Sequence, residues 1–264
     1  NKIRINSVKG VKVRFYRSVG HRGVLVLQGK DLSDDVNDAD VLGHVLRVRG
    51  KSRTGKRTAQ AVNEFMENAY DVLNSHVVNK NRELPANFIL LRGAGGYMKT
   101  DSFKKRTGMK GCVITGVGII KGIARFLGMD VVDVPGANGH LNTNISGKID
   151  AVIKKLGMYD FILLHLNGMD EASHDKSFKN KVGFLEKIDR LVFSTIIRLK
   201  HLNIIVTCDH ITSCKTGNHE KGPVPLLIYN PDDVGDGVAK FDESHCKKGF
   251  FTENPLEKIL LSLK

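Results

Sequence analysis

The second part of the chain alternates short, uniformly apolar runs with longer segments whose apolar positions recur at helical spacing. The apolar runs predict strands at 112–115, 130–134, 160–166, 203–208 and 225–229. The amphipathic segments predict helices near 120–127, 146–156, 179–199 and 255–263. Gly157 stands where a helix would end on a glycine cap. Because strands that are apolar on both faces are typical of parallel sheets covered by helices, the pattern predicts an α/β fold with such a sheet.

The first part of the chain has a different pattern. Its apolar runs predict strands at 11–16, 23–28 and 87–92, and a helix over 56–73 carries one apolar stripe from Ala61 to Leu73. Residues 99–111 are polar, basic and glycine-containing, without periodicity, which is typical of a boundary between domains. We therefore expect two domains, a smaller α/β domain at 1–104 and a larger one at 105–264.

Composition narrows the class of protein. The content of 41% hydrophobic and 26% charged residues is that of a water-soluble globular protein. No apolar run approaches the roughly 18 residues that would span a membrane. The four cysteines show no CxxC spacing, which favours reduced thiols and, with the absence of a signal-peptide pattern, a cytoplasmic location.

The net charge of +13 is concentrated in residues 1–110. Residues 1–110 hold 22 of the 41 Lys and Arg but 10 of the 28 Asp and Glu, which leaves 19 against 18 for the rest. Solvated surface lysines account for most of such an excess, and a small phosphorylated substrate or nucleic acid would account for the remainder. Aromatic residues are only 6%, Trp is absent and no nucleic-acid-binding motif occurs, so we expect no nucleic acid partner.

Candidate metal ligands follow two of the predicted strands. Asp170 and His174 come after the strand at 160–166, Asp209 and His210 come directly after the strand at 203–208, and His219 follows in the next loop. The carboxyl ends of parallel strands meet at one edge of the sheet, where ligands bind. Carboxylates and imidazoles together suit Mn²⁺, Zn²⁺ or a related divalent ion. Because five ligands exceed the needs of one catalytic ion, the pattern favours two metals that hold a phosphoryl group.

Taken in order, motifs along almost the whole chain resemble the archaeal-like, cofactor-independent phosphoglycerate mutases of the alkaline phosphatase superfamily. The matching segments are Thr58-Ala59, Asn63-Glu64-Phe65, Ala86 to Gly95, Ile119 to Arg125, Val134 to Ala137, Asp170 to Asp175, Asp209-His210, Gly222 to Pro225 and Phe241-Asp242-Glu243. The resemblance implies an incomplete alkaline-phosphatase-like sheet domain, preceded by an inserted domain that closes over the substrate.

The resemblance also implies a mechanism. It assigns Asp170, His174 and His219 to one metal, and Asp209 and His210 to a second. Mn²⁺ is the favoured ion, with Mg²⁺, Zn²⁺ and Co²⁺ as alternatives, and 2,3-bisphosphoglycerate is not required. The family interconverts 3-phosphoglycerate and 2-phosphoglycerate through a phosphorylated serine. That serine and a further Asp ligand match no position here, so we expect the chain to be the larger, C-terminal part of the enzyme and inactive alone.

Three basic residues are candidates for substrate contacts. Arg22 and Arg92 are expected to bind the carboxylate or phosphate, since a guanidinium fork matches both groups. Lys121 is expected to face the phosphate at the catalytic centre. The segment Asp38-Ala39-Asp40 departs from the family's usual Asp-Thr-Asp-Pro-His, which places a change in a substrate-side loop.

Two alternatives stay open. A metal-dependent phosphatase or another phosphomutase of the same superfamily would carry the same metal residues. A chain without its nucleophile could instead be a non-catalytic anion-binding protein, or one half of a split enzyme.

Overall fold

The structure is a computed structural model, and it describes residue 5 and residues 7–18, 20–41, 44–199, 201–232 and 234–249. Contacts divide the chain into two compact units, Asn1–Lys99 and Thr100–Lys264. The sequence places this boundary slightly later, between residues 104 and 105. The helix predicted at 255–263 lies outside the described residues.

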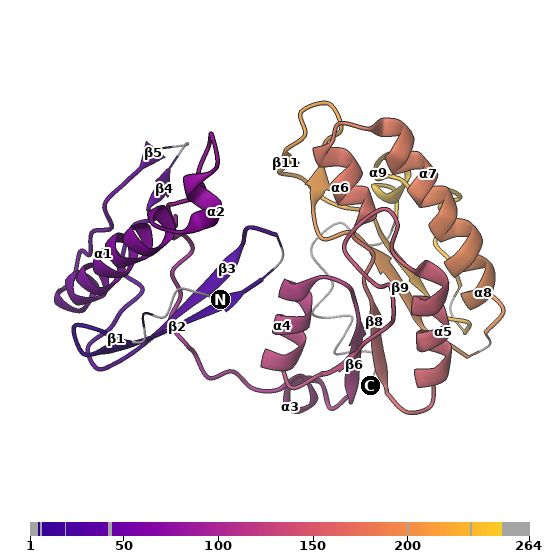
Figure 1. Cartoon of the computed structure of the whole chain (residues 1–264). Coiled ribbons are helices and arrows are strands. Elements are labelled where there is room, and N and C mark those ends of the chain that lie inside the picture. The colour runs from indigo at the N-terminus through magenta and orange to yellow at the C-terminus, as the bar shows by residue number, and fades with distance from the viewer. Residues whose placement is uncertain are drawn as a thin grey trace. The chain divides into compact units, whose positions relative to one another are not determined.

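Unit 1 is built on an antiparallel sheet and one long helix. The strands β1 (Ser7–Val8), β2 (Val11–Arg17) and β3 (Gly23–Gln28) pair in the order β1-β2-β3, and β4 (Asp40–Val41) pairs with β5 (His44–Val45). Helix α1 (Arg53–Asn74) lies across the three-stranded sheet (Figure 1), and the short α2 (Val77–Lys80) follows it. The apolar stripe of α1 meets alternate residues of β1 and β2, so that Val11, Phe65 and Ala69 are fully buried.

The strand predicted at 87–92 does not form. Residues 87–92 belong to no strand of the described chain. The backbone of this segment instead makes an isolated contact, in which Ala39 N–H donates to the Leu91 carbonyl at 2.7 Å. Ile89 and Leu91 still pack against the core of unit 1, which explains their apolar pattern without a ladder.

The predicted structureless boundary at 99–111 contains a helix, α3 (Phe103–Thr107). The Ser102 hydroxyl accepts a hydrogen bond from Lys105 N–H, and Gly108 ends the helix with φ 79°. These are ordinary helix start and stop signals, but one turn is too short for a periodic pattern to reveal it.

Unit 2 is an α/β unit. Its parallel sheet has the order β7-β6-β8, formed by β6 (Gly111–Ile114), β7 (Asp130–Val132) and β8 (Phe161–Leu164). Helix α4 (Gly118–Phe126) covers one face, while α5 (Ile145–Lys155) and α7 (Phe178–Ile188) cover the other (Figure 1). The predicted α/β fold with a parallel sheet is confirmed, and Gly157 has the expected left-handed φ of 75° after α5.

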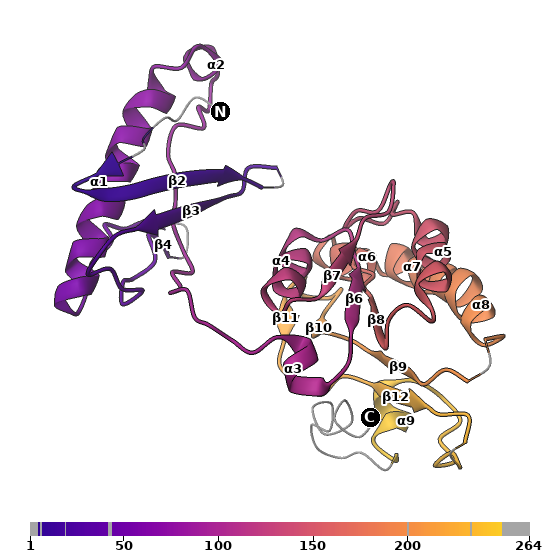
Figure 2. The same ribbon diagram turned by 90° about the horizontal axis from the view of Figure 1, so that it is seen from below.

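The last predicted strands form a separate pair. Strands β9 (Ile204–Thr207) and β12 (Leu226–Tyr229) are antiparallel and share no ladder with β7-β6-β8 among the described residues (Figure 2). The expectation of a wholly parallel sheet is therefore wrong for β12. Between them lie the two-residue strands β10 (Ile211–Thr212) and β11 (His219–Glu220), which also pair antiparallel. Helix α9 (Glu243–Cys246) follows.

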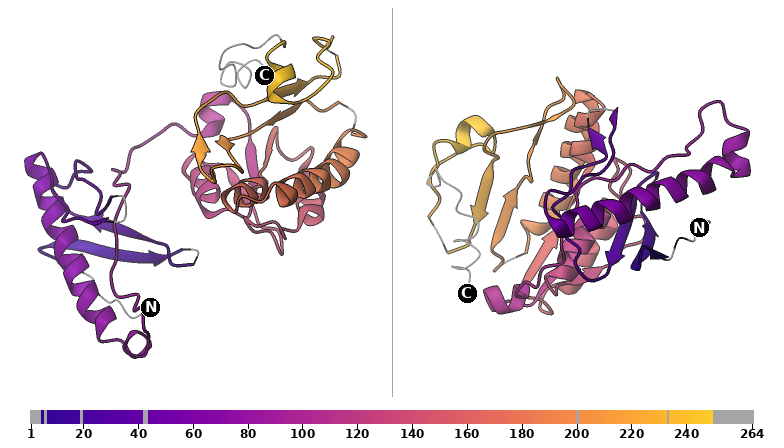
Figure 3. Two further views of the ribbon diagram at one scale, coloured as in Figure 1. Left: turned by 90° about the horizontal axis from the view of Figure 1, so that it is seen from above. Right: turned by 90° about the vertical axis from the view of Figure 1, so that its left-hand side faces the viewer.

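The single helix predicted at 179–199 is interrupted. After α7 the chain widens into a π-helix at Asp189–Phe193 and continues as α8 (Ser194–Ile196), in one curved rod (Figure 3). The hydroxyls of Ser194 and Thr195 donate back to the carbonyls of Arg190 and Leu191. Such back-bonding competes with the regular helix ladder.

Candidate metal centre

Helix α6 (Gly168–His174) follows β8 and places two of the predicted ligands one turn apart. Asp170 and His174 stand at i and i+4, so their side chains lie on the same helix face. His174 Nε2 lies 3.4 Å from Asp170 Oδ1. The sequence pattern alone therefore accounts for this pair once the segment is helical.

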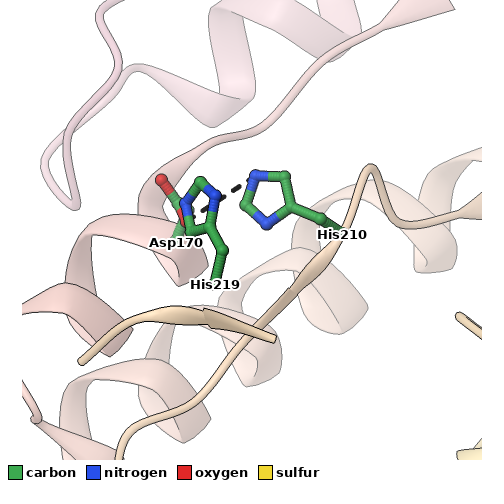
Figure 4. A group of neighbouring side chains, drawn as sticks. All are labelled: Asp170, His210 and His219. Atoms are coloured by element: carbon green, nitrogen blue, oxygen red, sulfur yellow. Dashed lines mark ion pairs between the residues drawn. The ribbon is translucent and has the colours of Figure 1, made fainter. Parts of the chain in front are cut away.

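Two further imidazoles reach the same carboxylate oxygen, His210 from the bend between β9 and β10 and His219 from β11. His210 Nε2 lies 4.0 Å and His219 Nε2 3.6 Å from Asp170 Oδ1. The ligand atoms of Asp170, His210 and His219 all lie within 4.8 Å of one another (Figure 4). His174 joins the group through His219, because their Nε2 atoms are 3.1 Å apart.

Hydrogen bonds orient these imidazoles. His174 Nδ1 lies 2.8 Å from the Gly217 carbonyl oxygen, which can only accept, so Nδ1 carries the proton and Nε2 keeps its lone pair. His210 Nδ1 lies 2.9 Å from the hydroxyl of Thr212, which is itself 2.7 Å from Asp170 Oδ1. Bonds of this kind on the far nitrogen are those that hold metal-ligating histidines in other proteins.

Asp209 is placed differently from the other predicted ligands. Its side chain is 80% exposed, and its Oδ2 lies 3.6 Å from His210 Nε2. The family resemblance pairs His210 with Asp209 in a second site, and His210 Nε2 lies between the two carboxylates, 3.6 Å from Asp209 Oδ2 and 4.0 Å from Asp170 Oδ1. The three imidazoles therefore gather around Asp170, with the exposed Asp209 beside His210. Imidazole nitrogens and carboxylate oxygens together fit a divalent ion.

A buried polar layer lies beside this group. Thr115, at the end of β6, is 3.1 Å from His165 Nδ1 through its hydroxyl, and the ammonium of Lys148 on α5 donates to the His165 carbonyl at 3.1 Å. Burial lowers the pKa of His165, the positive charge of Lys148 lowers it further, and the carboxylates of Asp209 and Asp170 oppose this. Nothing in the periodic pattern of α5 marks Lys148 as buried.

The loop after β7 is tied to the same helix. The Glu171 carboxylate accepts from Leu141 N–H at 2.7 Å and lies 2.5 Å from His140 Nδ1. Asn167 also donates to the Gly139 carbonyl at 3.1 Å. These contacts hold the loop against the turn that carries Asp170, and the sequence pattern does not predict them.

The basic candidates lie on several elements. Lys121, on α4, pairs with Asp133 at 2.6 Å and thereby lowers the pKa of that carboxyl. Arg22 is exposed in the turn before β3, and Arg92 lies 3.8 Å from Asp40. Both arginines belong to unit 1.

The glycine turn after Arg92 already uses its amides. Gly93 N–H donates to Asp38 and Gly96 N–H donates to Asp34, at 2.8 and 3.0 Å. The turn is therefore bound to the 34–40 loop by carboxylates.

Comparison with known proteins also indicates a metal-binding protein. Residues 40–255 match the model of a family described as the metalloenzyme superfamily. The 2,3-bisphosphoglycerate-independent phosphoglycerate mutase 1 of Methanocaldococcus jannaschii is 38% identical over 97% of this chain and 66% of its own length. The corresponding mutase of Sulfurisphaera tokodaii is 39% identical over 98% of this chain and 66% of its own length.

Solved structures agree. The cofactor-independent phosphoglycerate mutase of Thermoplasma acidophilum is 30% identical with a TM-score of 0.65, over 97% of this chain and 67% of its own. A Pyrococcus horikoshii protein is 32% identical with a TM-score of 0.73, over 80% and 59% of the two chains. The resemblance to this group of mutases is thus confirmed. The chain spans only 61 to 66% of the length of its curated relatives.

Proposed function

Because the chain belongs to the metalloenzyme superfamily, we propose that it is the larger part of a metal-dependent mutase that interconverts 3-phosphoglycerate and 2-phosphoglycerate. The observation that carries the proposal is the convergence of three imidazole Nε2 atoms on Asp170 Oδ1, at 3.4 to 4.0 Å. Its relatives of comparable fold are named as such mutases.

In this proposal Asp170, His174 and His219 hold one divalent ion, and His210 and Asp209 contribute to a second. Mn²⁺ is the expected ion, with Mg²⁺, Zn²⁺ or Co²⁺ as alternatives. A bound ion would neutralise charge on the transferred phosphoryl group and lower the pKa of the attacking hydroxyl. The Gly217 carbonyl and the Thr212 hydroxyl accept hydrogen bonds from Nδ1 of His174 and of His210, which leaves each Nε2 lone pair for the metal.

The remaining residues bind and orient the substrate. Lys121 faces the phosphate, and Arg22 and Arg92 supply guanidinium forks to the carboxylate or phosphate. The small phosphorylated substrate also accounts for the positive charge of unit 1. The proposed reaction belongs to glycolysis and gluconeogenesis, which supports a cytoplasmic location. The transfer uses a serine that matches no position in this chain, so we expect the 264-residue polypeptide to bind metal without completing the transfer.

Isothermal titration of the metal-free chain with Mn²⁺ tests the site. Asp170→Asn should abolish binding, whereas Asp175→Asn, an exposed carboxylate at the end of the same helix, should leave it unchanged. Equal affinity of both variants would refute the metal assignment.

A second experiment tests the reaction. The stretch of the M. jannaschii mutase that has no counterpart in this chain is supplied, and conversion of 3-phosphoglycerate is followed. Hydrolysis of p-nitrophenyl phosphate without mutase activity would replace the mutase by a phosphatase of the same superfamily.

A further inference from the structure

Unit 1 contains a cavity of about 750 Å³ beside the chain that leads into α1. Two segments line it, residues 34–37 and residues 46–51. The segments run antiparallel, since Val36 and Gly50 form an antiparallel bridge. A cavity of this size is typical of sites for small molecules.

Three basic side chains line this cavity from the second segment. They are Arg47, Arg49 and Lys51, and all three are exposed. Val48, between the two arginines, is 4% exposed and packs in the core of unit 1. The segment therefore turns its apolar residue inward and directs its positive charges to the cavity.

These positive charges are only weakly balanced by ion pairs. Arg47 Nη2 lies 4.0 Å from Glu67 Oε1, and the two side chains are 73% and 65% exposed. An exposed pair at this distance contributes little to stability, so Arg47 can turn to another anion at small cost. Arg49 and Lys51 form no ion pair among the described residues.

The two carboxylates of the cavity already accept backbone hydrogen bonds. Asp34 Oδ2 accepts from Gly96 N–H at 3.0 Å, and Asp35 Oδ2 accepts from Ser52 N–H at 2.8 Å. Hydrogen bonds from Ser52 lower the pKa of the Asp35 carboxyl, and the positive charge of Lys51 contributes less. Both carboxylates thus hold the loop together, and three cations against two carboxylates leave an excess of positive charge.

The side chain of Asn37 fixes the backbone that carries the arginines. Its Nδ2 donates to the carbonyls of Asp38 and Arg47 at 2.8 and 3.4 Å, and its Oδ1 accepts from Arg49 N–H. A loop that is ordered before its ligand arrives loses less entropy on binding. Leu46, which is 42% exposed, adds an apolar part to the wall.

We propose that this cavity binds a small molecule that carries a diphosphate group, such as a nucleoside diphosphate. Guanidinium forks match phosphate oxygens in pairs, and two forks with one ammonium suit a group that bears several negative charges. The volume and the apolar wall leave room for the rest of the ligand. Neither Arg22 nor Arg92 lines the cavity, so the site does not rest on the proposed function.

Isothermal titration of the metal-free chain with pyrophosphate and with ADP, at constant ionic strength, tests the site. We expect saturable binding of both. Arg49→Gln should weaken it at least about tenfold, because a guanidinium fork is lost while the backbone bonds to Asn37 remain. Arg57→Gln is the matched control, since it removes an equal charge from an exposed position of α1 outside the cavity and should bind as the unchanged chain does.

Amide shifts in NMR spectra locate the ligand, and ADP should shift the amides of residues 47–51. Equal affinities of the Arg49 and Arg57 variants would refute the proposal, because they would show diffuse attraction to a basic surface. Shifts centred on Arg22 and Arg92 would also refute it. So would a lack of saturable binding up to about 1 mM, or duplex DNA that displaces pyrophosphate from both variants alike. Neither measurement involves metal or mutase activity, so failure of the mutase proposal would leave this site unaffected.

Discussion

The hydroxyl of Thr212 lies 2.7 Å from Asp170 Oδ1, although 42 residues separate them in the chain. The Thr212 hydroxyl oxygen is also 2.9 Å from His210 Nδ1. When the hydroxyl donates to the carboxylate, it accepts from His210 Nδ1–H, which leaves the Nε2 lone pair for a metal. Thr212 is 5% exposed, so water does not replace these contacts readily.

Replacement of Thr212 tests this role. Thr212→Val keeps the shape but removes the hydroxyl, and we expect Mn²⁺ affinity to fall about 10- to 100-fold, as for other residues that orient metal ligands. Thr212→Ser retains the hydroxyl and should stay within a few-fold of the unchanged protein by isothermal titration. A Val variant that binds as tightly as the Ser variant would contradict this.

The buried ammonium of Lys148 predicts a pH-dependent stability of unit 2. The side chain is 1% exposed, and burial lowers its pKa from the ordinary 10.5 to about 8, with a smaller contribution from Lys121. Between these values the unfolded chain binds the proton and the folded chain does not, so stability rises with pH. Below pH 8 both states are protonated, and the cost of burying the charge is constant.

Urea unfolding of the unchanged protein and of Lys148→Met measures this effect. The stability of the unchanged protein relative to the variant should rise from pH 8 to 10.5. Burial raises the pKa of Cys112 to about 11, which acts in the opposite direction but equally in both proteins. A difference that does not change with pH would show that Lys148 stays charged in the fold.

Glu171 is expected to stabilise the loop after β7. Glu171→Ala removes the acceptor of Leu141 N–H and the partner of His140, and we expect a loss of about 1–3 kcal/mol in the free energy of unfolding. His140→Ala keeps the bond to Leu141 and should cost less. Limited proteolysis should then cut the 138–143 loop of the Glu171 variant faster, and an unchanged cleavage rate would contradict the contact.

Asn63 plays a comparable part in unit 1. Its side-chain amide donates to the Val48 carbonyl at 2.8 Å and accepts from Val48 N–H at 3.0 Å, in a buried position. Asn63→Leu leaves both backbone groups without this partner, which should destabilise unit 1 by about 1–3 kcal/mol. Gln60→Leu, an exposed change on the same helix, is the control. Hydrogen exchange at Val48 should accelerate only in the Asn63 variant.

The sequence by itself determined the local elements and the residue types of the site. Helix α1 follows from apolar residues at helical spacing, and strand β6 follows from a continuous apolar run. Both patterns lie in neighbouring positions of the chain, so they can be read without knowledge of distant contacts. The residue types and spacing of Asp170 and His174 were also visible in the sequence, but the helix α6 that places them on one face was not predicted. The order of motifs was enough to predict the family.

Only the tertiary structure decided which distant groups meet. The antiparallel direction of β12, the failure of 87–92 to form a strand and the π-turn after α7 depend on partners that no local pattern specifies. The burial of Lys148 and the contacts of Thr212 have the same origin. Hydrogen bonds and desolvation act between groups tens of residues apart, and their strength depends on packing that exists only once the chain has folded.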